Sequence, residues 1–235
     1  MIRRSGRLPW ILCSLALVSL PLHAQGLREL RERGQFGGGF LLAVPVGEFD
    51  RFVNLGGGVN LFGVFNLSPG GVLGLRVNGS VIGYGSSREP RSLSQTVPEV
   101  IVDVRTTNWI TTMGLGPQVT LGQGPVRVYS YGTVGFAYFS TVSSAGDHAH
   151  TFASSTNLDD WRFATALGGG LQFRVANRHR PVYLDLAVHG QHNGRTRYLR
   201  SGGIETRPDG SILITPIESQ ANLVTLRLGV SVSLF

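Results

Sequence analysis

Two histidines in the stretch AVHGQHNGR, His189 and His192, could act as a general base. On a β-strand, residues i and i+2 share one face, so a histidine there could activate a hydroxyl nucleophile two positions away. The residue two positions after His189 is Gln191, and the residue two positions after His192 is Gly194. Neither carries a hydroxyl. We therefore interpret His189 as a strand residue that faces an interior and His192 as a rim residue, and we predict that the protein is not an enzyme.

The stretch GDHAH is a second candidate site. Asp147, His148 and His150 could hold a divalent metal, because His-x-His on an extended strand points both rings to one side. Three candidate ligands in one polar stretch are a weak indication, and we interpret them as loop residues. The three GGG stretches are not followed by a helical pattern, which argues against a phosphate-binding loop. We expect no cofactor and no bound metal.

Eight segments of alternating apolar and polar residues must position these side chains. In the last segment, Leu226, Leu228 and Val230 fall on one parity, and Arg227 and Gly229 fall on the other. A period of two over such lengths is typical of β-strands. Each segment exceeds the roughly 9–11 residues that cross a bilayer at a barrel tilt. The segments are 35–45, 54–67, 72–84, 104–121, 126–142, 160–175, 182–199 and 220–235.

The connections between the segments alternate in length. Three are tight and carry turn residues, three are long and polar, and the first is of middle length. An up-and-down chain with turns at one end and loops at the other has this rhythm. We therefore predict an all-β protein, an eight-stranded antiparallel up-and-down transmembrane β-barrel. The connections are 68–71, 122–125 and 176–181 (tight), 85–103, 143–159 and 200–219 (long), and 46–53 (middle).

The last long connection contains Asp209-Gly210, which is a strong hairpin signal. We expect this connection to rise beyond the membrane as a hairpin, with Ile212 and Ile214 on one side. We interpret the hairpin as strand extension, and the alternative is a binding surface.

Alternation alone does not decide whether the apolar face points inward, as in a soluble lipocalin-like barrel, or outward to lipid. Three features favour apolar side chains outside. The segments are longer than most strands of soluble proteins, turns and loops lie at opposite ends, and aromatic residues lie near the segment ends. These aromatic residues are Phe36, Trp109, Tyr138, Trp161 and Phe235.

The opposite face then lines the interior, where eight strands leave room only for side chains. We predict a packed polar network rather than a pore, with Asp185 paired to one or two arginines. Arginines without a carboxylate should reach water near the ends, because burying an unpaired charge is costly. The predicted network consists of Arg76, Arg162, Arg174, Tyr183, Asp185, His189 and Arg227, beside Gln118 and Gln172.

The N-terminus has the pattern of a secretory signal peptide. A basic start precedes an apolar run from Trp10 to Leu20, and Ala24 precedes the expected cleavage point. We assign residues 1–24 to the signal peptide, 25–34 to a short N-terminal periplasmic segment and 35–235 to the barrel domain. The single cysteine, Cys13, leaves with the signal peptide, so we expect no disulfide.

All basic side chains other than histidine are arginines, and the net charge of +7 includes three arginines of the signal peptide. About +4 remains after cleavage, and the remaining arginines are scattered rather than grouped in runs. We therefore expect no nucleic-acid partner.

The signal peptide, the opening GQFGGGFLLAVPVGEFD, the stretch LGPQVTLGQGPVRVYSYGTVGFAYF and the last strand resemble bacterial outer-membrane β-barrel proteins of the porin-like, OmpA-type eight-stranded superfamily. The resemblance implies a bacterial outer-membrane location, contact with outer-membrane lipid and lipopolysaccharide, and passage by periplasmic chaperones. It also implies that Phe235 is part of an assembly signal that the barrel assembly machinery recognises. Phe235 departs from the pattern, because it shares the polar parity, and a β-bulge would restore it.

The function expected from these observations is a structural or loop-mediated surface role for a monomeric barrel with a packed polar lumen. A small porin-like channel is the alternative, and it would require the lumen to open past the arginines. A lipid A-modifying enzyme ranks third, because such barrels place a His and a Ser two residues apart, which His189 does not satisfy. A soluble lipocalin-like binder ranks fourth.

Overall fold

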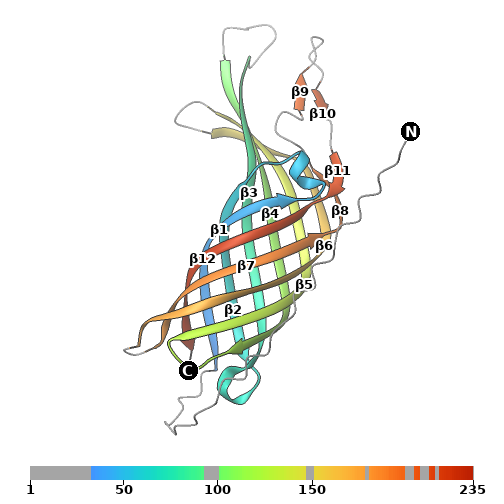
Figure 1. Ribbon diagram of the computed structural model, residues 1–235. Coiled ribbons are helices and arrows are strands. Elements are labelled where there is room, and N and C mark those ends of the chain that lie inside the picture. The colour runs from blue at the N-terminus through green and yellow to red at the C-terminus, as the bar shows by residue number, and fades with distance from the viewer. Residues whose placement is uncertain are drawn as a thin grey trace, which may run out of the picture.

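Eight long strands form a closed antiparallel barrel in the computed structural model, which describes residues 33–92, 101–146, 151–177, 180–198, 204–206, 212–214 and 217–234. Each strand pairs with its neighbours in sequence, and β12 closes the barrel against β1 (Figure 1). The predicted eight-stranded up-and-down barrel is confirmed. The barrel strands are β1 (Gly34–Val46), β2 (Gly56–Asn66), β3 (Leu73–Ser92), β4 (Ile101–Leu121), β5 (Val126–Gly146), β6 (Thr151–Ala176), β7 (Val182–Asn193) and β12 (Asn222–Leu234).

The two ends of the barrel differ, as the connection lengths predicted. The turn end carries the short connections β2–β3, β4–β5 and β6–β7, and the end of β12 lies there too (Figure 1). Gly70, Gly71 and Gly122 adopt positive φ at these turns, a backbone conformation that other residues rarely adopt. The loop end carries the connection with the short helix η1 (Phe49–Arg51) and the long arms of β3 to β6. The described residues include no helix that is long and apolar enough to cross a membrane.

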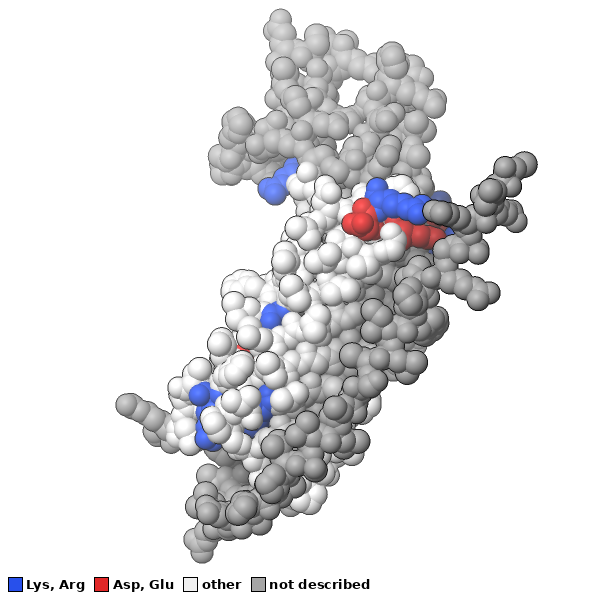
Figure 2. Space-filling model, viewed as in Figure 1, with Lys and Arg blue, Asp and Glu red and all other residues white. Residues whose placement is uncertain are grey.

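The barrel wall is apolar outside and largely polar inside. Phe40 is 75% exposed and Leu228 54% exposed, whereas Arg227, next to Leu228 in β12, is 4% exposed. The same alternation holds in the other barrel strands, so the predicted outward direction of the apolar parity is correct. Figure 2 shows charged side chains towards the two ends and a mostly uncharged wall between them. This distribution suits a barrel whose wall faces lipid, because exposing such an apolar surface to water would be unfavourable.

The long connections 85–103 and 143–159 are not the loops that the sequence predicted. β3 continues to Ser92 and β4 begins at Ile101, while β5 continues to Gly146 and β6 begins at Thr151. The prediction was wrong because it depended on apolar alternation, and a strand that continues past the lipid-facing wall need not follow that alternation. β3 leaves the barrel through a register shift after Gly83.

The last long connection contains the expected hairpin. β9 (Ile204–Thr206) pairs antiparallel with β10 (Ile212–Ile214), and the Asp209-Gly210 turn between them lies outside the described residues. A second small ladder joins β8 (Arg195–Tyr198) to β11 (Ile217–Gln220). The predicted segment 182–199 is thus split after Asn193, and 220–235 begins as a barrel strand at Asn222.

An arginine placed on the lipid-facing wall should destabilise the barrel according to its depth. Leu228→Arg, at the middle of β12, should lower the free energy of unfolding by about 2–4 kcal/mol, because the guanidinium would enter hydrocarbon. The matched variant Leu234→Arg, at the turn end of the same strand, should cost about 0–1 kcal/mol. Urea unfolding of the protein folded into lipid vesicles measures both, and equal costs at the two depths would contradict a membrane-embedded wall.

Candidate functional site

A buried ion pair lies at the centre of the lumen. The Nη2 atom of Arg227, on β12, is 2.8 Å from Oδ1 of Asp185 on β7, and both side chains are almost fully buried. The Tyr129 hydroxyl donates to the same carboxylate oxygen at 2.8 Å and accepts from Arg227 at 2.6 Å. Nη1 of Arg227 donates to Oδ1 of Asn60 at 2.7 Å. Four strands therefore meet at this pair.

Amide side chains extend the network around Asp185. Gln172 donates to the second carboxylate oxygen at 2.9 Å and exchanges hydrogen bonds of 3.1 Å with Gln35 on β1. Gln35 also donates to the Ser231 hydroxyl at 3.1 Å. On the other side of the lumen, Asn60 donates to Asn78 at 3.1 Å. The hydrogen bonds link strands that are far apart in the sequence, which holds the closed sheet in one register.

Arg76 is buried without a carboxylate partner among the described residues. Its Nη1 atom donates to Oε1 of Gln118 at 2.7 Å, and its Nη2 atom donates to Asn78 at 3.3 Å. Its guanidinium lies 4.0 Å from the ring centroid of Phe62 and 4.2 Å from that of Tyr131. Aromatic faces attract cations, and the attraction is larger where water is excluded. Amide oxygens and aromatic rings thus stabilise this cation in place of a carboxylate.

Phe62 also links the two buried arginines, because the guanidinium of Arg227 lies 4.4 Å from the same ring centroid. Two cations and one carboxylate therefore share the centre of the lumen, together with three aromatic rings. The sequence prediction omitted Phe62, Tyr129 and Tyr131. Their signal was present in the sequence, since each lies on the parity opposite to the outward-facing apolar residues of its segment.

Glycines on neighbouring strands make room for these rings. A Cβ atom at Gly168 would lie 2.8 Å from the Tyr131 hydroxyl oxygen and 2.5 Å from the Cβ of His189. A Cβ atom at Gly37 would lie 2.6 Å from the Phe62 ring. The glycine-rich stretches of β1 and β6 thus lie within strands and have a packing role. The sequence pattern had likewise argued that they are not phosphate-binding loops.

An apolar cluster fills the lumen at the loop end, above the polar network. The sequence did not predict it. Phe49, on η1, is 0% exposed and packs edge-on against Tyr84, with ring centroids 5.5 Å apart. Glu48, beside η1, accepts a hydrogen bond from the backbone of Gln220 at 3.2 Å. The middle connection therefore folds inward over the barrel mouth. The cluster comprises Leu41, Ala43, Phe49, Val53, Ile82, Tyr84, Ile110, Ala137, Phe139, Ala164, Ala221 and Leu223.

The structure brings together three of the seven predicted network residues, Arg76, Asp185 and Arg227, around shared partners. Arg162 lies at the loop-end rim, where it pairs with Asp160 at 2.7 Å and is 36% exposed. Arg174 lies at the turn end, half-buried, two residues beyond Gln172 on β6. Depth along the strand, rather than parity, separates these arginines from the central network.

Tyr183 and His189 face the lumen and are buried, but they lie beside the central ion pair rather than in it. The guanidinium of Arg127 lies 4.4 Å from the ring centroid of Tyr183. His189 is hydrogen-bonded to the Thr225 hydroxyl, its register partner on β12. A hydroxyl does therefore contact His189, but it comes from another strand and both side chains are sealed in the lumen. That burial separates the pair from the lipid-facing wall.

The two remaining predictions fall on residues that the structure does not describe. His148 and His150 lie outside the described residues, as does Phe235. Within the described part of the chain, no group of three metal-ligating side chains comes together.

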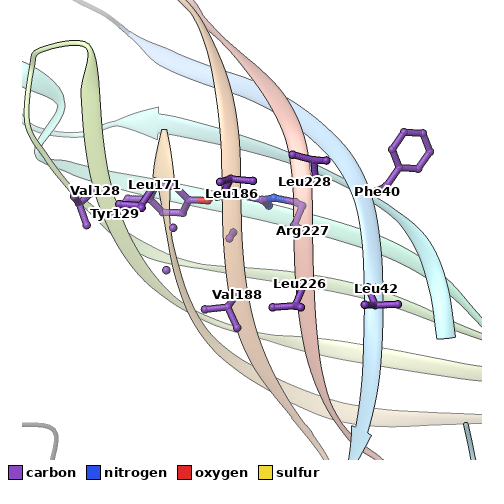
Figure 3. A pocket seen from close by; sticks show the side chains of 13 residues that line it. Phe40, Leu42, Val128, Tyr129, Leu171, Leu186, Val188, Leu226, Arg227 and Leu228 are labelled. Carbon is purple, nitrogen blue, oxygen red and sulfur yellow. Dashed lines mark hydrogen bonds between the residues drawn. The ribbon is translucent and has the colours of Figure 1, made fainter. Parts of the chain in front are cut away.

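The outer wall has a hollow of about 790 Å³ next to the central network. Figure 3 shows apolar side chains of β1, β5, β6, β7 and β12 around it, among them Leu186 and Leu228, with Tyr129 and Arg227 beneath. Gly169 and Gly170 contribute no side chain to this part of the wall. Because outward-facing apolar side chains of the wall line the hollow, it faces the lipid.

No protein-family profile matches the chain, and no curated protein sequence matches it. Solved structures with low similarity to the chain include the following three. Ail, the attachment invasion locus protein of Yersinia pestis, has 15% identity and a TM-score of 0.42, with 86% of this chain and 97% of that chain covered. Neisserial surface protein A has 11% identity and a TM-score of 0.41, with 88% and 99% covered. A major outer membrane protein from Thermus thermophilus has 14% identity and a TM-score of 0.46, with 84% and 99% covered. The fold assignment rests on the closed sheet itself.

Removing one partner of the central ion pair should be far more costly than removing one at the rim. Arg227→Gln should lower the free energy of unfolding by about 3–5 kcal/mol, because it leaves the carboxylate of Asp185 buried without its cation. The same substitution at the partly exposed rim, Arg162→Gln, should cost about 1 kcal/mol or less. Urea unfolding in vesicles compares the two variants, and similar losses would show that the central pair does not stabilise the barrel.

Proposed function

We propose that the protein is a non-conducting barrel of the bacterial outer membrane that holds a β-sheet outside the membrane for surface contacts. The observation that carries the proposal is the filling of the lumen by buried side chains. The central network, with Arg76 and Arg227, crosses its middle, and the apolar cluster with Phe49 fills the loop end. A small porin-like channel would require both layers to part, which would expose the central ion pair and the apolar cluster.

The outer-membrane location is supported by the closed sheet and by a barrel wall that is apolar outside and largely polar inside. A barrel without edges satisfies every backbone hydrogen bond within the sheet, which the hydrocarbon region requires. In barrels of this kind the short turns face the periplasm and the long connections face outward. We therefore propose that the loop end of this barrel lies at the cell surface. The apolar wall would contact acyl chains, and the rim would contact lipopolysaccharide.

The surface role is assigned to the arms of β3 to β6, which continue as a four-stranded sheet past the barrel. Ser87 pairs with Thr106, Thr106 with Ser143, and Ser143 with Ser155. By contrast, β2 pairs with β3 only as far as Gly83, and β7 pairs with β6 only as far as Ala164. The described sheet thus rises from one side of the barrel, as Figure 1 shows. Conformationally free loops would be a poorer recognition surface than a paired sheet, because binding would have to order them.

A sealed lumen predicts an impermeable barrel. Proteoliposomes that contain the folded protein should exclude arabinose as well as empty liposomes do, because side chains occupy the whole cross-section. Liposome swelling measures the permeability, with a general porin as the positive control and heat-modifiable gel migration to verify folding. Swelling at the rate of the porin would contradict the proposal and favour the channel.

The proposed orientation predicts opposite accessibility for the two ends. Because Cys13 is the only cysteine, single-cysteine variants report one position each after signal-peptide cleavage. Ser86→Cys, on the arm of β3, should react with a membrane-impermeant maleimide on intact cells, whereas Gln123→Cys, in the β4–β5 turn, should react only after permeabilisation. Both side chains are exposed in the folded protein. The unsubstituted protein is the background control, and the reverse labelling pattern would contradict the orientation.

A further inference from the structure

Arginines gather at the turn end of the barrel, apart from the acidic residues that the structure describes. Arg127 on β5, Arg174 on β6 and Arg33, directly before β1, continue the inward parity of their strands, and Arg180 lies in the β6–β7 turn. Figure 2 shows arginine side chains towards this end. Among the described acidic residues, Asp185 lies deeper, in the central network, and the others lie in the loop-end half of the molecule. The described turn end is therefore positively charged.

Strand pairing places three of these arginines around one side of the lumen mouth. Arg174 faces Tyr183 of β7 in the ladder, and the guanidinium of Arg127 lies 4.4 Å from the ring centroid of Tyr183. On the other side of β7, β12 carries Ser233, and the backbone N–H of Arg33 donates to the end of β12 at 2.9 Å. Because an eight-stranded barrel has an interior only wide enough for side chains, those that point into its mouth from different strands approach one another.

The guanidinium groups of Arg33 and Arg174 have unused donors. No hydrogen bond or ion pair joins either group to another described residue, although the side chain of Arg174 is half-buried. The carboxylate of Asp185 is not available to them, because three side chains of the central network already donate to it. A cation that is partly withdrawn from water is stabilised by an anionic acceptor. The two arginines are therefore placed to bind an anion.

A buried hydroxyl lies at the same end of the lumen. Ser233 is 0% exposed, and its Oγ atom has no hydrogen-bond partner among the described residues. It shares the inward parity of Ser231, whose hydroxyl accepts hydrogen bonds from Gln35 and Gln172 inside the lumen. Buried polar atoms rarely lack a partner, so the unused hydroxyl of Ser233 indicates a further hydrogen-bonding group at this mouth.

We propose that the turn-end mouth binds a phosphate group between Arg33 and Arg174, with the Ser233 hydroxyl as a further donor. Guanidinium groups form charge-assisted hydrogen bonds with phosphate oxygens, often two at once. Phosphate fits this mouth better than a carboxylate, because its tetrahedral oxygens accept from donors on several strands. The phosphate belongs to a phospholipid headgroup or to a soluble phosphate compound. The site is separate from the arms to which the surface role is assigned.

The test is calorimetric titration of the folded protein in neutral detergent, at constant ionic strength set with sodium chloride. One titrant is inorganic phosphate. The other is dihexanoyl-phosphatidylglycerol, with dihexanoylglycerol as the control lipid that lacks phosphate. At least one phosphate compound should bind, and the double variant Arg33→Gln/Arg174→Gln should weaken its binding about tenfold or more, because charged donors are lost. The matched double variant Arg195→Gln/Arg197→Gln, which removes two exposed arginines of β8 at the loop end, should leave binding unchanged.

The two titrants distinguish the sources of the phosphate. If inorganic phosphate binds as tightly as the lipid, the site takes soluble phosphate, and tighter binding of the lipid assigns the site to a headgroup. Both results support the proposal. Heat-modifiable migration checks that each variant is folded. If the double variant does not fold, Arg33→Gln alone, at an exposed residue before β1, should still weaken binding about threefold.

Two outcomes would overturn the inference. The first is no binding of either phosphate compound at millimolar concentration. The second is equal weakening by the turn-end and loop-end variants, which would show that general charge attraction, rather than a site at the turn-end mouth, holds the phosphate. Because purified protein in detergent is used, these outcomes are independent of the permeability and labelling results.

Discussion

The closed sheet leaves the interior to side chains alone, so every buried charge must find its partner on another strand. Arg227 and Asp185 meet across β12 and β7, and Asn60 and Tyr129 reach them from β2 and β5. A shift of one residue in any of these strands would turn its lumen side chain to the lipid. The ion pair and the apolar outer wall therefore constrain the register together, one from inside and one from outside.

The second buried arginine explains why the barrel has aromatic residues and glycines where it does. Arg76 has no carboxylate among the described residues and is held by Gln118, Asn78 and the faces of Phe62 and Tyr131. Rings of this size fit into an eight-stranded lumen only where the adjacent strand has no side chain. Gly37 and Gly168 therefore belong to the same arrangement as the cation.

A lumen filled in this way makes the barrel a rigid support for the strands that continue beyond it. The apolar cluster closes the loop end around Phe49, and the arms of β3 to β6 stand beyond it. A scaffold that is fixed by buried contacts tolerates change in its exposed segments, which is where binding surfaces commonly lie.

The sequence by itself determined the strands of the barrel and their lipid-facing sides, because a period of two is local and each strand in the membrane must satisfy it. It did not determine the arms, whose sequences carry no such period. It also placed Arg162, Arg174 and Arg227 in one network, since all three share the inward parity. Only the tertiary structure separated them, because depth depends on how strands pair: Gln35 and Gln172, hydrogen-bonded in the lumen, are 137 residues apart in the chain. The parity of a residue can be read from its neighbours in the sequence, whereas register and depth depend on contacts between residues that are distant in the sequence.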